Sequence, residues 1–232
     1  MIFNIVVISK NQDSFLENMV KQLDIQFPGI RRIFVLDRCE DVSVALLKSL
    51  KEPYIENKEG KGFLAGKMRD IGLSYLGVEN TFFLDGDRIP VNFSTPIISK
   101  ALELYDMCLS SIEIDPFRKR FFKDFFTLNL NQDCAFTCGL CIRKEMIKKI
   151  LTIQGGRLFH PAFDGVYGEE DAYLADVVLY LNGTCGLFPV QHYLTGSFSG
   201  PKNRMSFELQ QEKRKKMRNV LFEKGPVLRA FF

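Results

Sequence analysis

The chain has 232 residues, of which 46% are hydrophobic and 25% charged, and this composition excludes a disordered protein. A formal net charge of +3 is too small to indicate nucleic-acid binding as the main role. The sequence contains no apolar run of the ~18 residues that a membrane span needs and no basic, cleavable leader, so we expect a soluble, cytoplasmic protein.

The first half of the chain alternates between strand and helix patterns. Residues 2–8 form a continuous apolar run, typical of a strand that is buried on both faces. Ser14 and Glu17 make a capping box for the helix that follows, and Pro28 ends it. Further strands are expected at Ile33–Leu36, near Tyr54 and Ile55, and at Thr81–Leu84. One further helix is expected at Val42–Leu50, and another carries Leu64, Met68, Ile71 and Tyr75 on its apolar face. This alternation predicts βαβ units and an α/β fold with a mostly parallel sheet.

The second half is less regular but continues in one domain. Its expected elements are helices near Ile97–Tyr105, at Lys144–Leu151 and at Glu170–Leu181, a strand at Gly139–Ile142, and a basic helix after Ser199.

Two carboxylates, Asp85 and Asp87, flank Gly86 directly after the apolar strand TFFL. Ligands of open α/β sheets bind at the carboxyl ends of strands, and carboxylates are suitable ligands for Mg²⁺ or Mn²⁺ with substrate phosphates. A simple Asp-Gly turn is the alternative explanation.

A second acidic group, Glu169, Glu170 and Asp171, precedes an expected helix. Acidic residues in a first helical turn are favoured by the helix dipole, so capping explains part of the pattern. Three consecutive acids are more than a cap needs. His192 is one of two histidines, and a lone histidine is more often structural than a metal ligand.

Taken in order, these motifs resemble the GT-A glycosyltransferases, most closely the inverting family-2 type with the Glu-Asp motif of galactosyltransferase-like relatives. The resemblance covers about residues 2–195. The matching segments are IVVIS with Lys10-Asn11, FVLD with Asp37, GKGFLAGKMRDIGL with Arg69, FFLDGD, TCGLCIRKEMI, FDGVYGEEDAYLADVVLYLNG and FPVQHYL. It implies a GT-A domain at 1–198, with a donor-binding half at about 1–90 and an acceptor and catalytic half at about 91–198. The basic loop and helix at 199–232 are expected to pack on that domain.

The resemblance also implies the site and its ligands. The expected donor is a nucleotide-sugar, most simply a UDP-sugar, bound with Mn²⁺ or Mg²⁺. The implied metal ligands are Asp85, Asp87 and His192, and the implied donor contacts are Ser9, Asn11, Asp37, Arg69, Asp85 and Gly86. Asp171, with Glu170 beside it, is the implied catalytic base, which would invert the anomeric centre. Lys202 and Arg204 are candidates for closing over the diphosphate.

The acceptor class stays open among glycans, lipid-linked glycans, other hydroxyl acceptors and nucleic acid. The basic C-terminal helix is a candidate for peripheral membrane contact. Because the chain contains no Trp, the Gln-x-x-Arg-Trp signature of processive synthases is absent, and transfer of a single sugar is favoured.

Two alternatives belong to other classes. Cys134, Cys138 and Cys141 have the C-x₃-C-x₂-C spacing of radical-SAM enzymes, in which three thiolates hold an iron–sulfur cluster. A strand at 139–142 would point Cys138 and Cys141 to opposite faces, which favours buried structural thiols instead. The other alternative is a nucleotide-binding module that has lost its catalytic activity.

Overall fold

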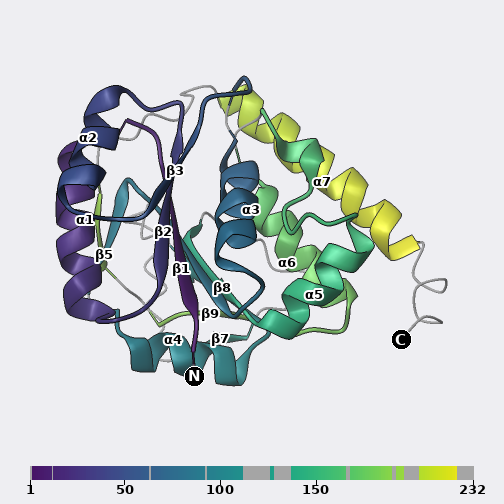
Figure 1. Ribbon diagram of the computed structural model, residues 1–232. Coiled ribbons are helices and arrows are strands. Elements are labelled where there is room, and N and C mark those ends of the chain that lie inside the picture. Colours follow the sequence, from purple (N-terminus) through teal and green to yellow (C-terminus); the bar gives the residue numbers. More distant parts are fainter. Residues whose placement is uncertain are drawn as a thin grey trace.

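The structure is a computed structural model that describes residues 2–11, 13–62, 64–91, 93–111, 126–127, 137–165, 168–189, 192–195 and 204–223. It has a central sheet flanked on both faces by helices (Figure 1), so the expected α/β class is confirmed. None of the described helices is long and apolar enough to cross a membrane.

Most elements of the first half lie where the sequence patterns predict them. The first half contains β1 (Asn4–Ser9), α1 (Asp13–Gln26), β2 (Arg32–Asp37), α2 (Asp41–Ser49), β3 (Tyr54–Asn57), α3 (Ala65–Leu76), β4 (Thr81–Asp85), β5 (Arg88–Val91) and α4 (Thr95–Leu104). The second half contains β6 (Met107–Ser111), β7 (Phe126–Thr127), β8 (Thr137–Ile142), α5 (Lys144–Ile153), η1 (Pro161–Phe163), α6 (Glu170–Tyr180), β9 (Cys185–Leu187), β10 (His192–Thr195) and α7 (Arg204–Glu223).

The main sheet has the strand order β3-β2-β1-β4-β8-β6-β9-β7. The strands from β3 to β4 are mutually parallel, whereas β8 runs antiparallel to both β4 and β6. The parallel half is the part that strict strand–helix alternation predicts. Strands β5, β6, β7, β9 and β10 were not expected, because they are short and lack a helical segment on each side to mark them.

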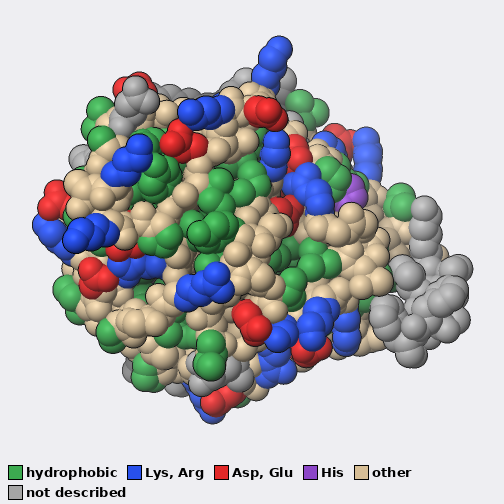
Figure 2. All heavy atoms as spheres, in the orientation of Figure 1, with side chains coloured by type: hydrophobic (Ala, Val, Ile, Leu, Met, Phe, Trp, Pro, Cys, Tyr) green, Lys and Arg blue, Asp and Glu red, His purple; other side chains and the backbone are tan. Residues whose placement is uncertain are grey.

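Alternating side chains along β1 divide the apolar core into two layers. Ile5 and Val7 pack with α1, α2 and α4, whereas Val6 and Ile8 pack with α3, α5 and α6. Figure 1 shows α1 and α2 on one side of the sheet and α3, α5 and α6 on the other. On the side that Figure 2 shows, acidic and basic side chains are interspersed, in keeping with the small net charge.

The buried face of α3 matches the sequence pattern in part, since Leu64 and Met68 are buried as expected. Tyr75, expected on the apolar face, is 56% exposed. The buried face also includes Arg69, Gly72 and Leu73, which were not expected there. A Cβ atom at Gly72 would lie 2.4 Å from Val6 Cγ1, so glycine lets the helix backbone approach β1 and turns this face inward.

Candidate functional site

The parallel strands β1, β2 and β4 place polar residues along one edge of the sheet. Ser9, Asp37 and Asp85 are the last residues of these strands. The register pairs Ile8 with Asp85 and Ser9 with Leu36, so the three residues end neighbouring strands at the same level. This is the carboxyl edge, where ligands of open α/β sheets bind.

Arg69 joins this edge to the second acidic group. Its guanidinium donates to Asp85 Oδ1 at 2.7 Å and to Glu170 Oε1 at 2.9 Å, and it lies 5.3 Å from the centroid of the Phe159 ring. Arg69 is only 4% exposed. Burial lowers its pKa, but the charges of Asp85 and Glu170 outweigh burial and raise it, so the guanidinium stays charged. The bridge unites two acidic motifs that are separated by 85 positions in the chain.

Asp171 stands beside this bridge in the first turn of α6. Burial, followed by the negative charge of Glu170, raises the pKa of Asp171 to about 7, although Arg69 opposes the shift. Its Oδ1 accepts a 2.8 Å hydrogen bond from the backbone N–H of Ala172. A carboxyl group with a pKa near neutrality is suited to exchange a proton with a substrate at physiological pH.

The two carboxyl groups after β4 fit a divalent cation that also binds substrate phosphates. Burial raises the pKa of both Asp85 and Asp87, against the opposing charges of Arg69 and Arg88 respectively. Counted with Glu170 and Asp171, the region holds four carboxyl groups against two arginines, and a cation would offset the excess. The described residues include no group of three or more His, Cys, Asp or Glu side chains placed to hold a metal. Two protein carboxylates nevertheless suffice for Mg²⁺ when waters and phosphates complete the shell.

Ser9 and Gly86 form a tight junction at the same edge. The backbone N–H of Gly86 donates to the carbonyl of Ile8 at 2.6 Å, and a Cβ at Gly86 would lie 2.8 Å from Ser9 Cβ. Only glycine fits at this position. The buried Ser9 hydroxyl has no hydrogen-bond partner among the described residues, and its contact with the donor stays a prediction.

The carboxylate of Asp37 is buried and hydrogen-bonded to neighbouring side chains. It is 5% exposed, and it accepts hydrogen bonds from Arg38 at 2.5 and 2.8 Å and from Asn57 Nδ2 at 3.0 Å. Arg38 also donates to the carbonyls of Gly60 and Gly62, which ties the loop after β3 to the end of β2. Donor binding by Asp37 stays a prediction.

Asn11 links the loops that follow β1 and β2. Its Oδ1 accepts a 3.0 Å hydrogen bond from the backbone N–H of Glu40, and its own N–H donates to Cys39 Sγ at 3.3 Å. A backbone φ of 51° places Asn11 in the left-handed region, where asparagine is well tolerated. Its contact with the donor also stays a prediction.

The backbone of His192 lies on the short ribbon that β10 forms with β5. His192 is paired with Val91, whereas Thr195 is paired with Arg88, the neighbour of Asp87. At roughly 3.4 Å per residue, His192 therefore lies about 10 Å along the ribbon from Arg88. The role of His192 as a metal ligand stays a prediction, and so does closure of Arg204 over the diphosphate. Lys202 lies outside the described residues.

The cysteine motif is only partly within the described residues, and Cys134 lies outside them. Cys141 is fully buried in β8, opposite Cys108 in β6. Burial, followed by a hydrogen bond with Cys141, raises the pKa of the Cys108 thiol. Cys141 thus packs as a small apolar residue within the core.

Several residues that shape the site were not identified from the sequence. Asp70 accepts hydrogen bonds from Arg157 and from the backbone N–H groups of Leu158 and Phe159, which fixes the segment bearing the Phe159 ring under Arg69. Arg214, in α7, bonds Glu169. Such pairs are 45 to 89 positions apart in the chain, so local spacing gives no signal for them.

Comparison with known proteins identifies the fold. No protein-family model matches the sequence, and no curated protein sequence matches it. A fragment of TarS from S. aureus, solved with UDP-GlcNAc, aligns with a TM-score of 0.64 at 16% identity over 87% of this chain and 60% of that one. The mannosyltransferase PcManGT from Pyrobaculum calidifontis, solved with GDP-Man and Mn²⁺, aligns with a TM-score of 0.59 at 12% identity over 81% of this chain and 54% of that one.

A putative glucose-1-phosphate thymidylyltransferase from Bacillus anthracis aligns with a TM-score of 0.52 at 11% identity, over 83% of this chain and 89% of that one. The chain spans less than two thirds of the length of the TarS fragment and of the mannosyltransferase. The architecture shared with these two is the GT-A fold that the sequence motifs predict.

Proposed function

We propose that the chain is a glycosyltransferase that moves one sugar from a nucleotide-sugar to an acceptor hydroxyl, with Mn²⁺ or Mg²⁺ at the donor site. The observation that carries the proposal is the Arg69 bridge, which holds Asp85 and Glu170 together beside Asp171. Structural likeness to proteins solved with UDP-GlcNAc and with GDP-Man and Mn²⁺ supports it. Of the two nucleotides, we expect UDP.

On the donor side, Asp85 and Asp87 are the residues that would hold the cation. When bound, the cation would supply positive charge to the departing nucleoside diphosphate. The Ser9 hydroxyl and the close approach permitted by Gly86 offer a polar surface beside them. His192 is the third candidate ligand.

On the acceptor side, Asp171 is the proposed general base. An acceptor hydroxyl is a weak nucleophile at neutral pH, and a carboxylate with a pKa of about 7 can take its proton as the new bond forms. Attack from the face opposite the leaving group inverts the anomeric centre. Retention of configuration in the product would contradict this assignment.

Nucleotidyl transfer is the second candidate, because the chain spans 89% of the thymidylyltransferase that shares its fold. A sugar phosphate is already anionic when it attacks a nucleoside triphosphate and needs no general base. The raised pKa of Asp171 therefore favours glycosyl transfer. Release of pyrophosphate from a nucleoside triphosphate and a sugar 1-phosphate would instead establish the second candidate.

The test is the thermal stability of the protein with nucleoside diphosphates and nucleotide-sugars, each with Mn²⁺ or EDTA. At one hundred times Kd a ligand stabilises the native state by ~2.7 kcal/mol. We expect a shift that needs both nucleotide and metal and that disappears in Asp87→Asn. The matched control is Asp24→Asn, which alters a carboxylate on α1 that is 63% exposed.

The outcome separates the alternatives. Absence of any nucleotide-dependent shift in the wild-type protein would contradict the proposal. A shift without sugar transfer or donor hydrolysis would indicate an inactive nucleotide-binding module, and bound iron would indicate the cysteine cluster.

A further inference from the structure

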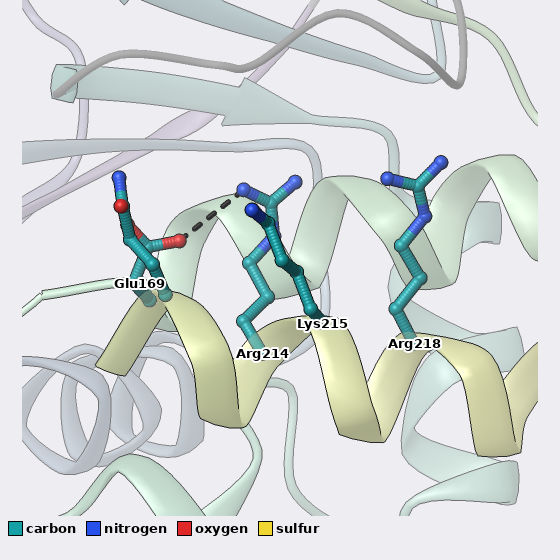
Figure 3. A pocket seen from close by; sticks show the side chains of 5 residues that line it. Glu169, Arg214, Lys215 and Arg218 are labelled. Atoms are coloured by element: carbon teal, nitrogen blue, oxygen red, sulfur yellow. Dashed lines mark hydrogen bonds and ion pairs between the residues drawn. The ribbon is translucent and has the colours of Figure 1, made fainter. Parts of the chain in front are cut away.

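Helix α7 packs on α6 through a buried ion-pair network. Arg214 donates to Asp176 Oδ2 at 2.8 Å and to its Oδ1 at 3.1 Å, and also to Glu169 Oε2 at 3.2 Å. Arg214, Glu169 and Asp176 are 8%, 7% and 3% exposed. Arg214 and Glu169 line a small cavity of about 40 Å³, and Figure 3 shows the side chain of Arg214 reaching from α7 towards Glu169. Removing one member of a buried ion-pair network leaves an uncompensated charge in the interior, so each member depends on the others.

Glu169 differs from an ordinary surface residue in its sequence position and in its backbone conformation. It directly precedes Glu170 and Asp171, and its φ of 71° follows a φ of 86° at Gly168. The left-handed region is unfavourable for a non-glycine residue, so surrounding contacts must hold Glu169 there. Glu169 makes no side-chain cap bond to α6. Its carboxylate is bound by Arg214 instead, so α7 contacts the residue that directly precedes the first turn of α6.

Lys213 provides a second contact from α7 to the same region. Its Nζ donates to the carbonyl of Ala162 and lies 5.6 Å from the centroid of the Phe163 ring. Phe163 in turn packs on Tyr173 of α6, with ring centroids 5.5 Å apart. Consecutive residues of α7 therefore hold both the segment before the acidic pair and the helix that carries it.

We propose that Arg214 is a positioning residue, which places Glu170 and Asp171 for catalysis through its ion pair with Glu169. The inference rests on the proposed function, because it treats these two acids as the catalytic pair. Arg214 touches neither acid: it acts through Glu169, while its bonds to Asp176 tie α7 to the helix that carries the pair. Helix α7 then contributes to the active site, which explains why Arg214 is buried while Lys216 on the same helix is exposed.

The test compares four variants in sugar transfer or donor hydrolysis. Glu169→Ala removes the held carboxylate but leaves the pair between Arg214 and Asp176, and Arg214→Lys keeps the charge but cannot reach both partners. We expect both to lower kcat by between about 10- and 100-fold with the donor KM within about twofold, since only placement of the acidic pair changes. Glu169→Gln keeps a hydrogen-bond acceptor and should retain most of kcat. Lys216→Met, at a side chain that is 75% exposed, is the control and should leave both constants unchanged.

Amide hydrogen exchange gives a readout that does not need activity. In Glu169→Ala and Arg214→Lys, exchange should accelerate at residues 172–176 and stay unchanged in α1. Unchanged kcat and unchanged exchange in these variants would overturn the inference. Faster exchange over the whole fold, with kcat and KM both changed, would also overturn it, because the contact would then stabilise the fold rather than place the acidic pair. A wild-type protein that neither transfers nor hydrolyses any nucleotide-sugar would contradict the proposed function. Amide exchange at residues 172–176 would still test whether the contact between Arg214 and Glu169 holds the start of α6.

Discussion

At the scale of single residues, Arg69 neutralises carboxylates from both acidic motifs of the site. It is the shared partner of Asp85 and Glu170, and both contacts are shorter than 3 Å. Removing one member of a buried ion pair leaves an uncompensated charge, which typically costs ~3–5 kcal/mol. We expect Arg69→Met to lower the free energy of unfolding by about this amount in urea denaturation. Lys67→Met, on the same helix, is the matched control and should change it by less than ~0.5 kcal/mol.

Asp171 sets a pH dependence that can be measured separately. As a general base it acts when deprotonated, and its pKa is raised to about 7. We expect kcat/KM for sugar transfer to rise tenfold per pH unit below about pH 6 and to level off above about pH 8. Asp171→Asn should abolish this limb together with activity, while nucleotide binding persists. A rate that is flat between pH 5.5 and 8 would argue against Asp171 as the base.

At the scale of elements, the contact between α3 and β1 depends on Gly72. Alanine is favoured over glycine within a helix by ~1 kcal/mol, so a free helix would gain from the change. Here the new Cβ would lie 2.4 Å from Val6 Cγ1 and 3.1 Å from Val35 Cγ2. We therefore expect Gly72→Ala to destabilise the protein by ~1–3 kcal/mol in chemical denaturation.

The exposed Ser74 on the same helix provides a control, since Ser74→Ala adds no atom to the interface. A double variant of Gly72→Ala with Val6→Ala should lose less than the two single variants added together, because the second change removes the obstructing methyl groups. A Gly72→Ala protein more stable than the wild type would refute the proposed packing constraint.

For the whole molecule, the sequence predicts the parallel half of the sheet and both acidic motifs, because each has a local signature. Strand β1 is a continuous apolar run, and Asp85 and Asp87 follow directly after a second apolar run, TFFL. The sequence does not predict the antiparallel insertion of β8 between β4 and β6, since strand order is decided by long-range pairing. Nor does it predict the partners of Arg69 or Arg214, which come from distant segments.

The buried carboxyl groups make the stability of the whole molecule depend on pH. The pKa of Asp70 is raised to about 6, chiefly by burial, and that of Asp171 to about 7. A carboxyl group whose folded pKa is raised above its unfolded value favours the folded state while protonated. That stability is lost as the pH rises from about 4 through the folded pKa. His160 opposes this below its ordinary value of 6.5, because burial lowers its pKa.

The net expectation is a protein more stable at pH 6 than at pH 8 by about 1 kcal/mol, or roughly 2–4 °C in Tm for a chain of this size. Thermal unfolding without metal or nucleotide measures the difference directly. In Asp171→Asn the group can no longer ionise, so Tm at pH 8 should rise and the difference between the two pH values should shrink. A wild-type Tm that increases from pH 6 to pH 8 would show that the carboxyl of Asp171 is not held in a strained, buried state. A gain in stability accompanied by loss of transfer in Asp171→Asn would indicate that the fold maintains this carboxylate for catalysis.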